Sequence, residues 1–139
     1  MNYMNLDDIQ LQDIPKIIDP NGRGNLSVIE KDVLPFEIKR VYYLYDVPSD
    51  SSRGGHAHIE LQQFLIALSG SFDVVLNSGV SRRIITLNRP NKGLLIPNGI
   101  WRELENFSAG SVCLSLVSDV YKEEDYIRNF DEFKLFKGG

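Results

Sequence analysis

Apolar residues occur in short runs, with polar residues alternating between them, over about residues 17 to 118. Runs of this length, separated by Gly, Asn, Pro and Ser, are typical of β-strands joined by tight turns. The expected strands are Leu26–Glu30, Ile38–Asp46, Gly55–Ile59, Gln63–Leu68, Phe72–Asn77, Arg82–Leu87, Leu94–Pro97, Ile100–Glu105 and Val112–Ser118. So many short strands favour an antiparallel sandwich or barrel.

The pattern changes at both ends of the chain. Tyr126, Ile127, Phe130 and Phe133 recur at three- and four-residue spacing behind an acidic turn, which predicts an amphipathic helix over 122–136 that packs on the barrel. Residues 1–16 have no clear period, and we expect them to form an N-terminal arm. The 139 residues therefore predict a single domain, with the arm at 1–16, the barrel at 17–118 and the helix at 122–136.

Composition and charge narrow the classes of function. The chain lacks an apolar run of the roughly 18 residues that a membrane helix needs, and it starts with a polar segment, so we expect a cytoplasmic protein without a membrane partner. Its 15 basic and 19 acidic residues form no basic stripe, which argues against nucleic-acid binding. Cys113 lies in an apolar run and is expected to be a reduced core thiol.

Both histidines of the chain lie in Arg53-Gly54-Gly55-His56-Ala57-His58. Residues two apart in a strand share a face, so the two imidazoles are expected side by side. Without further context, a His-x-His pair is as compatible with two surface or capping residues as with a functional site. Gln63 and Gly70 then follow at the spacing of the first cupin motif, and the segment from Pro97 to Asn106 has that of the second motif. Two motifs in this order predict a cupin-type antiparallel β-barrel or jelly roll.

Two departures from those motifs change the expected chemistry. Arg102 stands where metal-binding cupins have their third histidine, and Gln63 stands where they have a glutamate. A guanidinium offers only donors and repels a cation, and an amide is a weak ligand, so we expect no metal and no cofactor. Histidine titrates near neutral pH, so the pair suits acid–base catalysis instead.

Strand alternation adds further candidates. Arg40 and Tyr42 share a face with each other and can therefore enter one cavity. Arg23 lies in a glycine-flanked turn that a phosphate could approach, although on sequence alone a solvated turn explains it somewhat better. We also assign Arg53, Gln63 and Arg102 to substrate binding.

The chain resembles the nucleotide-sugar 3,4-ketoisomerases, the WxcM-like cupin domains of bacterial surface-polysaccharide pathways. The resemblance spans about residues 17 to 136 and rests on Asp19 to Leu26, Pro35 to Tyr43, Arg53 to His58, Ile100 to Glu103 and Asp125 to Arg128. It implies a homodimer, a dTDP-linked 4-keto-6-deoxyglucose substrate and no metal. It also implies that His56 is the carbon acid/base, that His58 and Tyr42 share its pocket, and that Arg23 and Arg40 contact the nucleotide-sugar.

Two other functions stay open at this point. A nucleotide-sugar 3,5-epimerase performs a similar proton abstraction, but its usual signature is a histidine paired with a carboxylate, which the run from His56 to His58 does not show. A non-catalytic sugar-binding cupin would bind the sugar without exchanging carbon-bound hydrogen.

Overall fold

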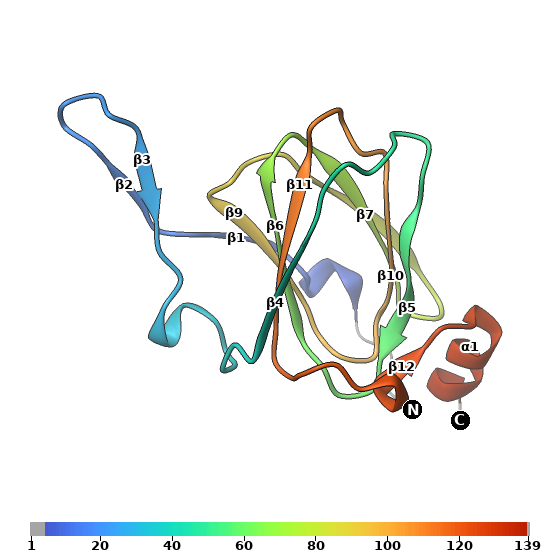
Figure 1. Ribbon diagram of the computed structural model, residues 1–139. Coiled ribbons are helices and arrows are strands. Elements are labelled where there is room, and N and C mark those ends of the chain that lie inside the picture. The colour runs from blue at the N-terminus through green and yellow to red at the C-terminus, as the bar shows by residue number, and fades with distance from the viewer. Residues whose placement is uncertain (1–4, 139) are drawn as a thin grey trace.

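The computed structural model describes residues 5–138 and contains two facing five-stranded antiparallel sheets, as the sequence predicts (Figure 1). The first sheet has the strand order β1-β9-β6-β11-β4. Its strands are β1 (Leu11–Asp13), β9 (Lys92–Ile96), β6 (Gln63–Ser69), β11 (Val112–Val117) and β4 (Arg40–Leu44). Alternating residues of β6 and β11 face in opposite directions, which gives the first sheet an inner and an outer apolar face.

The second sheet has the order β12-β5-β10-β7-β8. Its strands are β12 (Tyr126–Ile127), β5 (Arg53–His58), β10 (Trp101–Glu105), β7 (Phe72–Asn77) and β8 (Arg82–Leu87). From β4 to β12, most strands that are consecutive in the sequence lie in different sheets, as do β4 and β5 or β9 and β10, so the chain crosses repeatedly between the two layers; β7 and β8 are the pair that stays in one sheet. This arrangement is a jelly roll, and it confirms the predicted all-β, cupin-type fold.

The main core fills the space between the two sheets. Leu65 and Ala67 of β6 face inward and pack with Val74 and Leu76 of β7. The neighbouring β6 residues face outward and are covered by the segment 29–38, which includes the short 3-10 helix η2 (Lys31–Val33). Cys113 is buried in the inner core, where burial raises the pKa of its thiol to about 12, so it is the core thiol expected from the sequence.

Gly70 shows why the first motif ends in glycine. It has a φ of +68° in the turn between β6 and β7, a conformation that other residues rarely adopt. A Cβ at this position would lie 2.4 Å from Oγ of Ser108. Both constraints favour glycine in the turn that carries the chain from β6 in the first sheet to β7 in the second.

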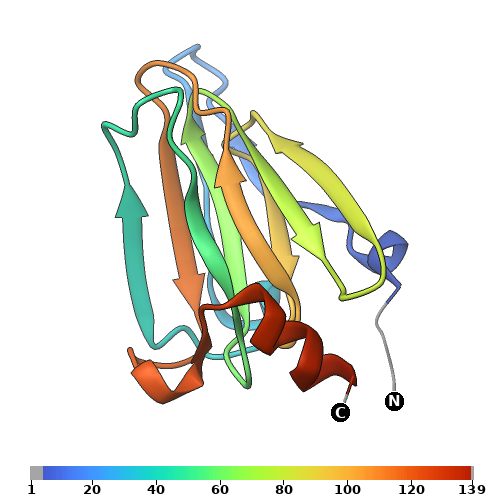
Figure 2. The ribbon, with the colours of Figure 1, turned by 90° about the vertical axis from the view of Figure 1, so that its right-hand side faces the viewer.

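The C-terminal segment differs from the prediction. Residues 122–136 do not form one helix: the 3-10 helix η3 (Glu123–Asp125) leads into β12, and the helix α1 (Phe130–Gly138) begins only at Phe130. Tyr126 pairs with His58 and Ile127 with Ala57, because β5 offers an open strand edge at this point. The packing prediction is confirmed, since Phe133 is fully buried and the Phe130 ring lies 5.3 Å from that of Trp101. Figure 2 shows the dark-red helix across the lower end of the second sheet.

The N-terminal residues belong partly to the first sheet. The predicted arm, 1–16, lies in part outside the described residues; within them, the 3-10 helix η1 (Leu6–Asp8) inserts Leu6 into the core, and β1 pairs with β9. The hairpin of β2 (Lys16–Ile18) and β3 (Asn25–Ser27) then projects away from both sheets (Figure 1). In the described part of the chain, no helix has the length and hydropathy needed to cross a membrane.

Candidate functional site

A polar cavity of about 270 Å³ opens between the two sheets. Its lining residues are Arg40, Tyr42, Leu44, Arg53, His56, Gln63, Arg102, Leu104, Tyr126 and Arg128. Strand β4 supplies every second residue, Arg40, Tyr42 and Leu44, because its alternation points this face inward, as the sequence predicts. The cavity therefore collects side chains from strands that are far apart in the sequence.

Two of the eight predicted site residues do not line this cavity. His58 lies directly behind it and is only 1% exposed. Arg23 lies in the turn of the β2–β3 hairpin, where its guanidinium forms an ion pair with Asp19 at 2.9 Å. Its side chain is 75% exposed and does not reach the cavity of its own chain. The other six, Arg40, Arg53, Tyr42, His56, Gln63 and Arg102, are brought together as expected.

The two histidines have different environments although they share a strand face. The His58 ring meets the His56 ring edge-on, with 4.8 Å between the ring centres. Nδ1 of His58 lies 3.0 Å from a carboxylate oxygen of Asp125. Asp125 also accepts hydrogen bonds from the backbone N–H groups of Glu60 and Leu61, which fix its position. His58 is thus held from behind, while His56 lies against the cavity.

Electrostatics distinguish the two rings further. Burial lowers the pKa of His58 to about 3, and the positive charges of Arg102, Arg128 and Arg40 act in the same direction. These effects favour the neutral imidazole, whose Nδ1–H donates to the carboxylate of Asp125. A buried ring that stays neutral and carries a fixed hydrogen bond suits orientation of its neighbour better than proton exchange.

A hydrogen-bonded group forms one wall of the cavity. Nε2 of Gln63 donates to the Tyr42 hydroxyl at 2.6 Å and to Oγ of Ser115 at 2.7 Å. Nη1 of Arg102 donates to Oε1 of Gln63 at 2.7 Å, and its Nη2 donates to the Ile100 carbonyl at 2.9 Å. Burial lowers the pKa of Arg102 to about 10, so the guanidinium stays charged at neutral pH. The polar groups of Gln63 and Arg102 are thus largely engaged within the protein, and their contact with substrate stays a prediction.

Cations line the cavity together with aromatic rings. The Arg40 guanidinium lies 4.7 Å from the centre of the Tyr42 ring, and that of Arg128 lies 4.2 Å from the centre of the Tyr126 ring. Nε of Arg128 also donates to Glu123 at 2.8 Å. With Arg53, these side chains give the cavity a positive character that suits an anionic ligand.

Sequence reasoning missed Tyr126, Arg128 and Asp125 as site residues. Helical spacing assigned this segment to a helix that packs on the barrel, whereas it is a 3-10 turn followed by a two-residue strand. Alternation would have placed Tyr126 and Arg128 on one face, since they are two residues apart. Only the pairing of β12 with β5 brings that face to the cavity.

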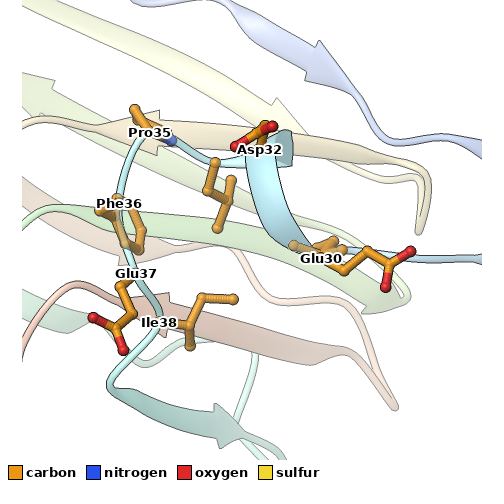
Figure 3. Close-up of a pocket in the computed structure, with 8 residues that line it drawn as sticks. Glu30, Asp32, Pro35, Phe36, Glu37 and Ile38 are labelled. Atoms are coloured by element: carbon orange, nitrogen blue, oxygen red, sulfur yellow. The ribbon is translucent and has the colours of Figure 1, made fainter.

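A second cavity, of about 430 Å³, lies under the segment 29–38 and contains no histidine. Figure 3 shows the carboxylates of Glu30, Asp32 and Glu37 pointing in different directions rather than toward one point. Phe36 and Ile38 contribute to the outer apolar cluster of the first sheet. We therefore interpret this cavity as a gap left where the segment 29–38 packs on the first sheet, and not as an active site.

The donor set of the polar cavity does not suit a metal ion. Within residues 5–138, no cluster of three His, Cys, Asp or Glu side chains has the geometry to hold one. The cavity lined by His56 also holds the Arg102 cation and the Gln63 amide, which are poor metal ligands. His58 does pair with a carboxylate, that of Asp125, which is the arrangement we named as the usual signature of a 3,5-epimerase; the carboxylate comes from a distant segment and not from the run from His56 to His58.

The jelly roll and its histidine-containing cavity define a cupin-type protein. The chain belongs to the family described as WxcM-like, C-terminal (FdtA), which it matches over residues 7–138. It is 45% identical over 122 residues to the TDP-4-oxo-6-deoxy-alpha-D-glucose-3,4-oxoisomerase of Aneurinibacillus thermoaerophilus. The aligned region covers 87% of this chain and 86% of that protein.

Solved structures agree with this family. A 3,4-ketoisomerase from Helicobacter canadensis has a TM-score of 0.90 and 46% identity, covering 95% of this chain and 98% of that one. The 3,4-ketoisomerase QdtA from Thermoanaerobacterium thermosaccharolyticum, solved with TDP, has a TM-score of 0.90 and 41% identity, covering 96% of this chain and 97% of that one. A dTDP-4-dehydrorhamnose 3,5-epimerase from Bacillus anthracis is only 16% identical, with a TM-score of 0.74, and shows the fold alone.

Proposed function

We propose that this protein is a sugar 3,4-ketoisomerase that converts dTDP-4-keto-6-deoxyglucose into its 3-keto isomer, for the biosynthesis of unusual deoxy and amino sugars. The observation that carries the proposal is that His56 and Tyr42, a carbon acid/base and an oxygen acid/base, line one cavity together with arginines. Family membership supports the same substrate class.

The carbon chemistry is assigned to His56. The 4-keto group acidifies the hydrogen on carbon 3, and neutral His56 removes it to give an enolate between carbons 3 and 4. The imidazolium so formed returns a proton to carbon 4. His58, held by Asp125 and in edge contact with His56, keeps the catalytic ring oriented during both transfers.

The oxygen chemistry is assigned to Tyr42. Its hydroxyl gives a proton to the oxygen on carbon 4 and takes the proton from the oxygen on carbon 3, so that the carbonyl moves by one carbon with no net change in protons. Burial raises the pKa of Tyr42, which keeps the phenol protonated before the reaction. Preorganised donors of this kind typically contribute roughly 3 kcal/mol to stabilising an oxyanion.

The nucleotide is held by the arginines. Arg40, Arg53 and Arg128 line the cavity, and arginine forms charge-assisted, often bidentate contacts with phosphate. We assign the diphosphate to these side chains and to Arg23, and the sugar to the wall of Gln63 and Arg102.

The test of function is NMR of the product formed from dTDP-4-keto-6-deoxyglucose in heavy water. A ketoisomerase yields the 3-keto sugar and incorporates solvent deuterium at carbon 4. An epimerase would exchange the hydrogens at carbons 3 and 5 and keep the 4-keto group. A binding protein would leave every carbon-bound hydrogen in place, and either of these results would refute the proposal.

We further propose that the protein acts as a homodimer whose β2–β3 hairpin lies on the partner subunit. The hairpin exposes Ile17, Ile18 and Leu26, and the outer face of the first sheet exposes Val41 and Leu68. Burying such side chains together is favourable by about 25 cal/mol per Å². A second copy would cover these surfaces and carry Arg23 toward a cavity other than its own.

A further inference from the structure

One wall of the cavity is a chain of hydrogen bonds that joins Arg102, Gln63, Tyr42 and Ser115. The chemistry of these side chains decides which of them donates and which accepts at each bond. Arginine is only a donor, so the Gln63 atom that lies 2.7 Å from Nη1 of Arg102 has to be the amide oxygen. The other end of the amide is then the NH₂ group, which is also only a donor. Arg102 therefore fixes which way the Gln63 amide points, independently of how similar its two ends are in shape.

This direction determines what the Tyr42 hydroxyl does. Nε2 of Gln63 lies 2.6 Å from the Tyr42 oxygen, so that oxygen accepts a hydrogen bond and the phenolic proton has to point elsewhere. The second N–H of Gln63 donates to Oγ of Ser115. Ser115 can then direct its own proton to Tyr42: its hydrogen bond lowers the pKa of the phenol, against the larger rise caused by burial. Both neighbours thus act as donors to the Tyr42 oxygen.

We propose that Gln63 is a positioning residue that makes Tyr42 a hydrogen-bond donor toward the substrate, with its amide direction set by Arg102. The inference rests on the proposed role of Tyr42 in the oxygen transfer. Gln63 is 3% exposed and Arg102 is 1% exposed, so water competes little for these hydrogen bonds. The accepted bond from Gln63 also stabilises the phenolate that forms when Tyr42 gives up its proton.

The decisive variant is Gln63→Glu, which keeps the size of the side chain and its contact with Arg102 but reverses the polarity at Tyr42. A carboxylate oxygen accepts the Tyr42 proton and withdraws it from the sugar. We expect kcat to fall by at least about tenfold, and by a larger factor than KM rises, because the lost donor acts mainly in the reaction step. Ser115→Ala is the comparison: it removes a donor to the Tyr42 oxygen without placing an acceptor beside it, so kcat should fall clearly less than in Gln63→Glu.

A double-mutant cycle separates polarity from other effects of the new charge. Tyr42→Phe alone should lower kcat strongly, and adding Gln63→Glu should then lower it little further, because there is no phenolic proton left to misdirect. An equal loss from Gln63→Glu in both backgrounds, or an unchanged kcat in the single variant, would overturn the inference. Full activity in Tyr42→Phe would instead refute the role proposed for Tyr42 itself.

Discussion

Two imidazoles on one strand face have different tasks because their surroundings differ. His56 lines the cavity, while His58 is buried and bound to Asp125. Strand spacing predicted the shared face but could not distinguish the rings, because the distinction depends on Asp125, which is 67 residues away from His58 in the sequence. The resemblance to 3,4-ketoisomerases, rather than the spacing, assigned the carbon step to His56.

The variants His56→Asn and His58→Asn test this division of tasks. Asparagine cannot exchange a proton near neutral pH, so His56→Asn should lower kcat by roughly 10²- to 10⁴-fold and abolish deuterium uptake at the sugar ring. His58→Asn should slow the reaction but keep the exchange. Binding of free dTDP, measured by calorimetry, should persist in both and serves as the control for folding. Loss of exchange in His58→Asn together with its retention in His56→Asn would reverse the assignment.

At the scale of elements, local patterns predicted the long strands well and the C-terminal segment poorly. The bounds of β7 and β8 agree with the expected runs, because alternation over six residues is a strong local signal. Strand β12 has only two residues, and its conformation depends on pairing with β5 rather than on its own pattern. The same dependence on tertiary contacts hid Tyr126 and Arg128 from the sequence-based site.

Helix α1 stabilises this region through one buried aromatic ring. Phe133 is fully buried against Trp101 and Ile127, so Phe133→Ala should lower the free energy of unfolding by about 3–5 kcal/mol. Leu135 lies on the same helix but is 76% exposed, and Leu135→Ala should change that free energy by less than about 0.5 kcal/mol. Urea unfolding followed by fluorescence compares the two. Equal effects would mean that the helix does not depend on the Phe133 contact.

For the whole molecule, the sequence predicted the fold and six of the eight site residues in one cavity, but it could not place Arg23. The cupin motifs describe residues of the two five-stranded sheets of one chain, whereas the β2–β3 hairpin forms hydrogen-bonded pairs with neither of these sheets. The exposed apolar side chains on that hairpin, Ile17, Ile18 and Leu26, are most simply explained by contact with a second copy. Arg23 would then act in the partner subunit, which a single-chain pattern does not reveal.

Mixing two impaired variants tests this arrangement. If the cavity of one chain uses Arg23 of the other, a hybrid of Arg23→Ala and His56→Asn chains contains one intact site, and the mixture should regain up to about a quarter of the wild-type activity at substrate concentrations below KM. If Arg23 serves its own chain, no hybrid site is intact and no activity returns. Adding Ile18→Asp to both chains should prevent recovery and give monomers in sedimentation velocity, because a carboxylate would be buried at the interface. Val80, 68% exposed in the β7–β8 turn against 67% for Ile18, is the matched control, and Val80→Asp should leave both the dimer and the recovery unchanged.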